Sequence, residues 1–347
     1  MTDFQQIIIN WYHENKRDLP WRTTKKPYNI WLSEIILQQT RVAQGLSYYE
    51  KFIRHYPTVK DLAAASEQAV LADWQGLGYY SRARNLHATA KYVTSELKGE
   101  FPKEFKSILQ LKGIGEYTAA AIASFAYDLP HAVVDGNVFR VLSRLHDIDL
   151  PIDSNSGKKY FTALANELID KYNPGIYNQA IMEFGAIQCV PGKPNCGGCP
   201  LTDQCVSFKQ QNVLERPIKK AKTKVRDRFF LYLIYWKPSS RTFFLQKRTK
   251  KDIWQELYEF PLIEFDSNEA RLDYIRSKSN EIHYLSDEQK HILSHQHIYG
   301  SFAFIKSDRI IDQFEDLIEL NFDELPNYPL PRLIDRFIEN NYSLFKS

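Results

Sequence analysis

The segment LKGIGEYT, residues 111–118, decides the fold, and the motif VVDGN, residues 133–137, follows it after an alanine-rich run. Gly113 and Gly115 lie between two helical segments, where glycine permits a sharp turn and lets backbone N–H groups approach a phosphate. The helix that starts after them would direct the positive end of its dipole at the same phosphate oxygen. The segment therefore predicts two helices joined by a hairpin that anchors a DNA backbone.

Two acidic residues have contrasting surroundings. Glu34 is the single acid in the otherwise uncharged residues 31–40, where burial would raise its pKa and keep it protonated near neutral pH. Asp135 follows an apolar run at the predicted start of a helix, where N–H donors favour the ionised form. An acid and an anion together suit cleavage of an N-glycosidic bond, because the leaving base needs a proton and the sugar becomes cationic. Taken singly, Glu34 also fits a helix-face acid paired with Arg41, and Asp135 a plain N-cap.

The bulk composition allows two globular domains. The chain has 347 residues, of which 44% are hydrophobic and 25% charged, so each of two domains can bury a core. A net charge of +3 is too small to indicate a nucleic-acid partner by itself. No apolar run approaches the roughly 18–20 residues that span a bilayer, and the first residues lack a signal peptide's pattern. The sequence therefore predicts a cytoplasmic protein.

All four cysteines fall in one short segment. They have the spacing Cys189-x6-Cys196-x2-Cys199-x5-Cys205, which leaves no cysteine for a long-range disulfide. Four thiolates suit either zinc or an iron–sulfur cluster, and the spacing differs from the bacterial ferredoxin run. The segment predicts one metal site whose metal stays open on spacing alone.

The hydrophobic period changes along the chain. From Phe4 to about Leu201 apolar residues recur at helical spacing, and prolines separate the segments. Residues 229–236 and 242–246 are apolar and aromatic runs that predict a β-hairpin. The sequence predicts further strands near 258–264 and 297–306, and helices near 267–279 and 330–341.

A basic segment separates these halves. Seven of the thirteen residues from Arg216 to Arg228 are basic, which predicts either a solvated connector or a strap that follows phosphates. The predicted domains are residues 1–206, a linker 207–228, and residues 229–347.

Several motifs occur in the order of a known family. They are Leu19-Pro20-Trp21-Arg22, Ser33-Glu34 to Gln38-Gln39-Thr40, Gln75-Gly76-Leu77-Gly78-Tyr79-Tyr80, the hairpin, Val134-Asp135-Gly136-Asn137, and the cysteine cluster. Over almost its whole length the chain resembles the helix-hairpin-helix DNA glycosylases and, within them, the MutY adenine glycosylases.

This resemblance implies a fold and an activity. The fold is multidomain: an all-α helix-hairpin-helix glycosylase domain with a [4Fe–4S] cluster loop at residues 189–205, then an α+β MutT-like domain of the Nudix fold. The activity is hydrolytic removal of adenine mispaired with 8-oxoguanine or guanine, in base excision repair of double-stranded DNA after the nucleotide is flipped out. We expect a monomer without membrane attachment, in the cytoplasm and, in a bacterium, at the nucleoid.

The resemblance also assigns residues. Glu34 would protonate adenine and later activate water, Asp135 would stabilise the sugar cation, and Tyr117 and Asn137 would orient them. The implied DNA-contacting residues are Arg22, Gln39, Leu77, Tyr79, Gly113, Gly115, Ser294 and His295. The implied cluster ligands are Cys189, Cys196, Cys199 and Cys205, with zinc as the alternative metal.

Three positions qualify these assignments. Tyr117 stands where the endonuclease III branch has a lysine, which Schiff-base chemistry needs as nucleophile, so we expect little or no strand cleavage. In the second domain Asp252 replaces a frequent glycine, and Leu293 replaces an aromatic that often precedes the Ser-His pair. The acids of a Nudix box are missing from the sequence, so this domain should bind the damaged base without hydrolysing a nucleotide.

Other functions also fit parts of the sequence. A thymine or uracil glycosylase would share the helical core, although the MutT-like domain argues against it. A bifunctional lyase is disfavoured by Tyr117. A non-catalytic iron–sulfur DNA-binding or redox-sensing module would not need Glu34 and Asp135 together.

Overall fold

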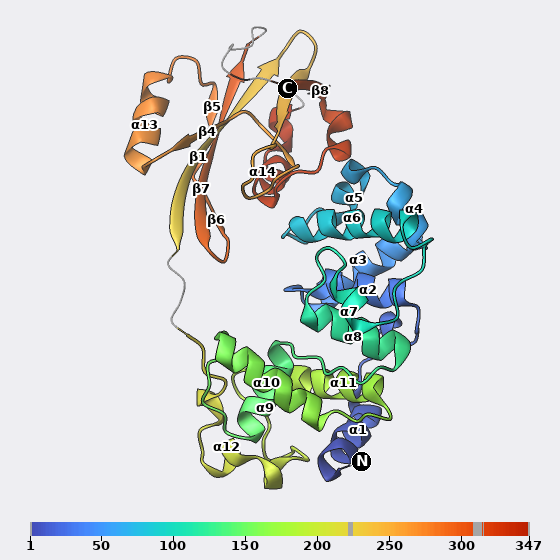
Figure 1. Ribbon diagram of the computed structural model, residues 1–347. Helices are drawn as coiled ribbons and strands as arrows, with labels where there is room; N and C mark the ends of the chain where they lie inside the picture. The colour runs from blue at the N-terminus through green and yellow to red at the C-terminus, as the bar shows by residue number, and fades with distance from the viewer. Residues whose placement is uncertain (1, 221–224, 308–313, 315, 346–347) are drawn as a thin grey trace. The chain divides into compact units, whose positions relative to one another are not determined.

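The computed structural model describes residues 2–220, 225–307, 314 and 316–345. The chain divides into two compact units, Met1–Ala64 with Asn85–Ala221 and Ala65–Arg84 with Lys222–Ser347 (Figure 1). Helices build the first unit, and a sheet with flanking helices builds most of the second. The predicted fold class, a helical domain followed by an α+β domain, is confirmed. The predicted linker 207–228 stays a prediction, and its residues 221–224 lie outside the described part.

The first unit is assembled from short helices. Its elements are α1 (Asp3–Asn15), η1 (Pro20–Arg22), α2 (Pro27–Leu37), α3 (Val42–His55), α4 (Val59–Ala64), most of α6 (Ser81–Ser95), α7 (Phe105–Leu109), α8 (Glu116–Tyr127), α9 (Gly136–Leu145), α10 (Asn155–Leu168), α11 (Pro174–Glu183), η2 (Phe184–Gln188), η3 (Thr202–Gln204), α12 (Val206–Lys209) and η4 (Val213–Glu215). No helix among the described residues is long and apolar enough to cross a membrane.

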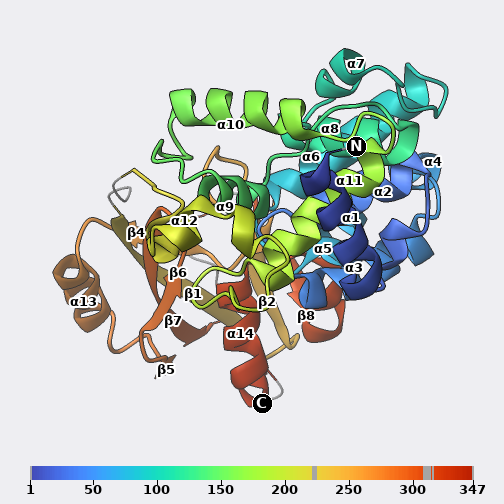
Figure 2. The ribbon, with the colours of Figure 1, turned by 90° about the horizontal axis from the view of Figure 1, so that it is seen from below.

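Helices α2 and α8 form the centre of this unit. Most of α2 is buried around its whole circumference, which its almost entirely uncharged sequence permits. In α8 the residues from Thr118 to Phe125 are all buried, and their small alanine side chains let α2 approach closely. Helix α11 packs against both α8 and α1, and α1 lies along α11 (Figure 2).

The predicted hairpin joins α7 to α8. Gly113 has φ +78°, and a Cβ there would lie 2.6 Å from the Cβ of Asn85, so both conformation and space require glycine. Gly115 is the N-cap of α8, and a Cβ there would meet no atom within 4 Å. The N-terminus of α8 is therefore open to the approach of a ligand.

The second unit is built around a mixed sheet. Its strands are β1 (Arg226–Lys237), β2 (Thr242–Lys247), β3 (Tyr258–Glu259), β4 (Leu262–Phe265), β5 (Tyr284–Leu285), β6 (Gln289–Ile292), β7 (Gln296–Lys306) and β8 (Ile318–Asn321). Its helical segments are α5 (Glu67–Trp74), the first turn of α6, α13 (Asn268–Ser277), η5 (Phe322–Asn327), α14 (Arg332–Asn340) and η6 (Tyr342–Phe345).

Strand β1 is the central strand of the sheet. It pairs antiparallel with β2, as predicted for the hairpin, and also with β4, while its longest ladder is parallel with β7. Phe230 and Tyr232 point toward α14, whereas Leu231 and Leu233 point toward α13, and Figure 1 shows these helices on opposite faces. Burial on both faces explains why β1 is a continuous apolar run rather than an alternating one.

The contact between α14 and the sheet should dominate the stability of the second unit. Phe337 is fully buried and stacks on Phe302 with ring centroids 3.9 Å apart. We expect Phe337→Ala to lower the free energy of unfolding by about 3–5 kcal/mol, because it removes apolar contacts and leaves a cavity. Urea denaturation followed by circular dichroism measures this loss. Leu272→Ala on α13, where the side chain is 39% exposed, should cost far less, and equal losses would contradict the prediction.

Candidate active site

A cavity of about 460 Å³ in the helical unit contains the predicted catalytic residues. Glu34 from α2, Tyr117 from α8, and Asp135 and Asn137 at the start of α9 all line it, together with Arg22. Its size is within the usual range of small-molecule pockets. Residues about one hundred positions apart in sequence are thus brought to one place, as the sequence predicts for its acid and anion.

Burial sets the protonation of Glu34. The residue is 6% exposed, and desolvation by burial raises its pKa to about 7, with a smaller contribution from the nearby charge of Asp135. The Tyr117 hydroxyl donates to Oε2 over 2.5 Å and opposes this rise. Burial also raises the pKa of Tyr117 well above its usual value, so the phenol remains a donor. The predicted elevation of the Glu34 pKa is confirmed.

Asp135 is held by more donors than Glu34. It is the N-cap of α9, and its Oδ1 accepts from the backbone N–H groups of Asn137 at 2.9 Å and Val138 at 2.8 Å. The Asn137 amide donates to Oδ2 at 2.7 Å. Burial nevertheless raises the pKa of Asp135, although these donors oppose the rise. The N–H donors favour the ionised form, as the sequence predicts, but desolvation outweighs them and the pKa of Asp135 lies above its ordinary value.

An ion-pair cluster forms another part of the wall. Glu183 on α11 is 1% exposed and accepts from Arg17 and Arg22, with one contact of 2.6 Å to each. Burial acts to raise the pKa of Glu183, but the hydrogen bonds from the two arginines hold it at about 2. Arg22, one of the implied DNA-contacting residues, lies in the pocket wall with its guanidinium bound by Glu183. Sequence reasoning missed Arg17 and Glu183 because no motif connects residues so distant in the chain.

Helix α9 connects this cavity to the cysteine segment. Arg140 donates to the side-chain oxygen of Asn137 at 2.8 Å and to the backbone oxygen of Cys189 at 2.7 Å. Because arginine has no acceptor, the carbonyl side of the Asn137 amide faces Arg140 and its nitrogen faces Asp135. One turn further on, Arg144 donates to the Cys189 sulfur at 3.4 Å.

The four cysteines are gathered in one place. Cys189, Cys196, Cys199 and Cys205 line one small cavity with Arg144, and all four are free thiols. They surround this space without converging on one point: among the described residues no three His, Cys, Asp or Glu side chains are close enough to hold a single metal ion.

The predicted DNA-contacting residues lie outside the cavity, except for Arg22. Gln39 follows α2 with φ 56°, and the hairpin glycines lie at the start of α8. In the second unit Leu77 is buried, whereas Tyr79 is 46% exposed and has φ 46°. The Tyr79 hydroxyl lies 3.5 Å from the Ser294 Oγ, and His295 follows Ser294 at the start of β7. The structure therefore brings together two sequence motifs that supply implied DNA-contacting residues.

Comparisons with known proteins agree with this architecture. Residues 32–171 match the model of the HhH-GPD superfamily base excision DNA repair proteins, and residues 231–340 match that of the NUDIX domain. The solved structure of a thermostable thymine-DNA glycosylase is similar with a TM-score of 0.54 and 30% identity, over 60% of this chain and 95% of that one. Fold and cavity thus define a helix-hairpin-helix base-excision repair protein with an appended NUDIX domain.

Curated relatives identify the family more closely. An adenine DNA glycosylase of Buchnera aphidicola subsp. Acyrthosiphon pisum is 33% identical over 343 residues, 97% of this chain and 97% of that protein. One from Buchnera aphidicola subsp. Schizaphis graminum is 34% identical over 303 residues, 86% of this chain and 85% of the relative. The chain belongs to the adenine DNA glycosylase family, and the predicted MutY resemblance is confirmed.

The Glu183 cluster should stabilise the helical unit. We expect Glu183→Gln to lower the free energy of unfolding by about 3 kcal/mol at pH 7, because two arginines lose their shared anion. Since the pKa of Glu183 is about 2 when folded and ordinarily 4.5, its contribution is complete above about pH 4.5 and disappears as the pH falls toward 2. Urea unfolding of both proteins at pH 7, 5 and 3 measures this difference. Exposed Glu50→Gln should change little at any pH, and a Glu183→Gln loss that persists undiminished at pH 3 would contradict the assignment.

Proposed function

We propose that this chain is a monofunctional DNA glycosylase that removes adenine paired with 8-oxoguanine or guanine in double-stranded DNA, acting as a monomer. The observation that carries the proposal is the pair of carboxyl groups, Glu34 and Asp135, that line one cavity with different hydrogen-bond partners. Membership of the adenine DNA glycosylase family supports adenine as the excised base.

The geometry supports different chemical roles for the two carboxyl groups. Glu34, with its raised pKa, donates a proton to a ring nitrogen of adenine as the bond from C1′ to the base breaks. Adenine leaves with that proton and the bonding electron pair, and Asp135 stabilises the positive charge left on the sugar. Water then adds to C1′ and returns a proton to the Glu34 carboxylate. Tyr117 positions Glu34, and Asn137 positions Asp135.

The lining of the cavity supports hydrolysis without strand cleavage. A lyase needs an amine that attacks C1′, and no lysine lines the cavity among the described residues. The cations in its wall are arginines, which stay protonated and serve poorly as nucleophiles. Tyr117 offers only a phenol whose pKa burial has raised. These residues favour water as the nucleophile.

The cysteine segment fits a [4Fe–4S] cluster better than the alternative, zinc, because no three cysteines of the described segment are close enough to hold a single metal ion. Four free thiols line one small, mostly apolar space, and thiolates are the ligands that iron–sulfur clusters and zinc prefer. Cys189, Cys196, Cys199 and Cys205 would hold the group. When bound, it would organise the loop that carries Lys193 and that Arg140 and Arg144 connect to α9. The proposed reaction takes no step through it.

The second unit supports recognition of the base opposite adenine. Tyr79 and Ser294 lie within 3.5 Å of each other, and His295 adjoins them. Exposed side chains that offer a ring and hydrogen-bonding groups suit a nucleobase. The missing acids of the Nudix box favour binding over hydrolysis. We assign these residues to 8-oxoguanine, Gln39 to the duplex stack near that base, as the resemblance implies, and the hairpin glycines to the DNA backbone. Leu77, which the resemblance places near the same base, is buried and would have to move to contact DNA.

Removal of either carboxylate should abolish the reaction. We expect Glu34→Gln and Asp135→Asn to slow adenine release by at least about 10²–10³-fold, since one loses the proton donor and the other the anion. The measurement is the single-turnover rate on duplexes with adenine opposite 8-oxoguanine, with Glu50→Gln as a control that keeps wild-type activity. A duplex with thymine opposite guanine tests the alternative specificity. Full activity in both variants would rule out the mechanism, and an inactive wild type would favour a non-catalytic role.

The rate should have a maximum as a function of pH. Because Glu34 must be protonated and its pKa is about 7, the single-turnover rate should fall about tenfold per pH unit above that value. It should also fall in acid as Asp135 takes up a proton, at a pH above the ordinary aspartate pKa of 3.8. A profile of excision rates at constant ionic strength measures both limbs. A rate that stays constant up to about pH 9 would contradict the role of Glu34 as acid.

A further inference from the structure

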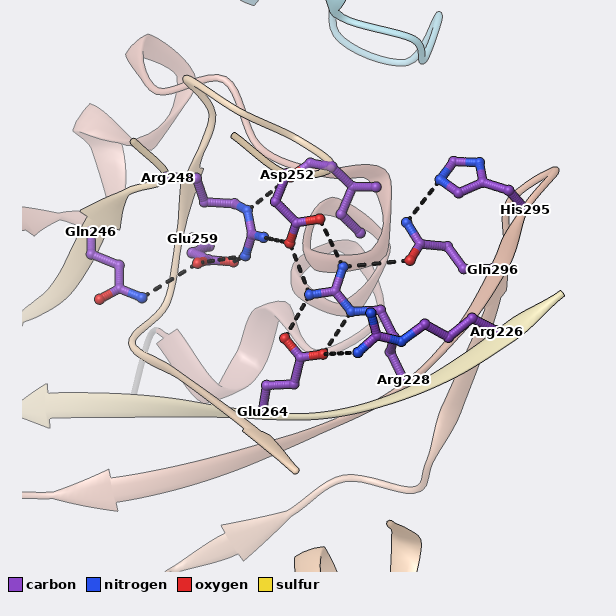
Figure 3. Close-up of polar contacts among 10 residues, drawn as sticks. Arg226, Arg228, Gln246, Arg248, Asp252, Glu259, Glu264, His295 and Gln296 are labelled. Atoms are coloured by element: carbon purple, nitrogen blue, oxygen red, sulfur yellow. Dashed lines mark hydrogen bonds and ion pairs between the residues drawn. The ribbon is translucent and has the colours of Figure 1, made fainter. Parts of the chain in front are cut away.

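A buried arginine in the second unit has all its donors in use. Arg228 on β1 is 7% exposed and lies between the carboxylates of Asp252 and Glu264 (Figure 3). Glu264 accepts from Nε at 2.7 Å and Nη2 at 2.6 Å, while Asp252 accepts from Nη1 at 2.9 Å and Nη2 at 2.8 Å. A guanidinium has five N–H groups in a rigid plane, so one remains, on Nη1. The Gln296 Oε1 lies 3.5 Å from that nitrogen.

The fixed arginine determines how the Gln296 amide is turned. Arginine can only donate, so the carbonyl oxygen of Gln296 must face Arg228 and the NH2 group must face the other way. That NH2 nitrogen lies 3.1 Å from the Nε2 of His295 (Figure 3). Because the amide nitrogen can only donate, Nε2 of His295 has to be the acceptor. The imidazole is then neutral and carries its proton on Nδ1.

This tautomer acts on the neighbouring hydroxyl. The His295 Nδ1 lies 3.5 Å from the Ser294 Oγ, so in this tautomer the Nδ1–H group donates to that oxygen. The Tyr79 hydroxyl is a second donor to the same oxygen, also at 3.5 Å. With donors directed at both lone pairs, the serine hydroxyl is left to donate its own proton outward. Ser294 and His295 are both exposed, so an external group can receive it.

We propose that Gln296 is a positioning residue that fixes the Nδ1–H tautomer of His295 and thereby makes Ser294 a hydrogen-bond donor to the base opposite adenine. The second part rests on the proposed function of this unit. A donor directed at C8 suits 8-oxoguanine, which carries an oxygen acceptor there, whereas guanine has a hydrogen on C8 and its nearest acceptor at N7. We call the chain of hydrogen bonds from Arg228 through Gln296 and His295 to Ser294 the relay. Asp252 belongs to it, because it supplies one of the two carboxylates that fix Arg228.

The tautomer can be measured without DNA. Nitrogen chemical shifts of selectively 15N-labelled histidines in the full-length protein distinguish a protonated Nδ1 from a protonated Nε2. We expect His295 to be protonated at Nδ1 in the wild type. Gln296→Glu should reverse this, because a carboxylate accepts from Nε2–H while it stays beside Arg228. Gln246→Leu is the matched control: Gln246 donates to Glu259 at 3.3 Å in the adjoining ion-pair group and has no contact with the histidine in Figure 3.

Affinity for DNA tests the consequence for Ser294. Duplexes with a non-cleavable 2′-fluorinated adenosine opposite 8-oxoguanine or guanine give the preference between the two bases as a ratio of dissociation constants. We expect Gln296→Glu to reduce the wild-type preference for 8-oxoguanine about fivefold to tenfold, the scale of one hydrogen bond, and Gln246→Leu to preserve it.

The outcomes separate this proposal from the proposed function. A wild-type His295 protonated at Nε2, or a tautomer that Gln296→Glu leaves unchanged, would overturn the relay whether or not the variant folds well. A reversed tautomer with an unchanged base preference would overturn the link to Ser294. A wild type that excises no adenine would instead refute the proposed function, and the tautomer measurement would still decide the relay.

Discussion

The burial of one ionisable carboxyl between two apolar helices is the constraint on which the rest of the structure depends. Helix α2 is buried on nearly all sides, and α8 presents a row of alanines that lets it come close. Glu34 is the single acid within α2, so its charged form loses hydration, and the attraction of the Arg22 charge in the same cavity is too small to compensate for that loss. Its hydrogen-bond partner is a neutral phenol, which leaves a proton on the carboxyl near neutral pH.

The proposed mechanism also needs an anion near that proton, and Asp135, the N-cap of α9, would supply it. Asp135 caps the helix with its carboxylate and therefore has two backbone donors that no side-chain motion can remove. Arg140 orients Asn137, and Asn137 donates to Asp135. The same arginine binds the backbone of Cys189, so the cysteine segment and the cavity share one rigid element. The second unit has a similar arrangement. There Arg228 donates to the side-chain oxygen of Gln296 and so fixes which way that amide is turned, as Arg140 does for Asn137.

Local signals in the sequence predicted much of this. Two glycines at the hairpin, an acid at a helix start and four clustered cysteines each impose a short-range geometry, and the structure has the corresponding turn, cap and cysteine pocket. The β1–β2 hairpin was predicted for the same reason. The parallel pairing of β1 with β7 was not predicted, because it joins distant strands. The rise in the Asp135 pKa was not predicted, since burial depends on the whole fold while capping depends on three residues.

A raised pKa alone would not have identified the active site. Burial also raises the pKa of Glu259 to about 7, although Arg248 opposes it, and this residue too lines a cavity. Arg248 donates to both oxygens of Glu259, at 2.8 and 2.7 Å, so a proton there would disrupt a two-point ion pair. Among the described residues Glu34 accepts only from Tyr117, and only at Oε2. A proton on its other oxygen disrupts no ion pair, and for this reason we propose Glu34, and not Glu259, as the proton donor.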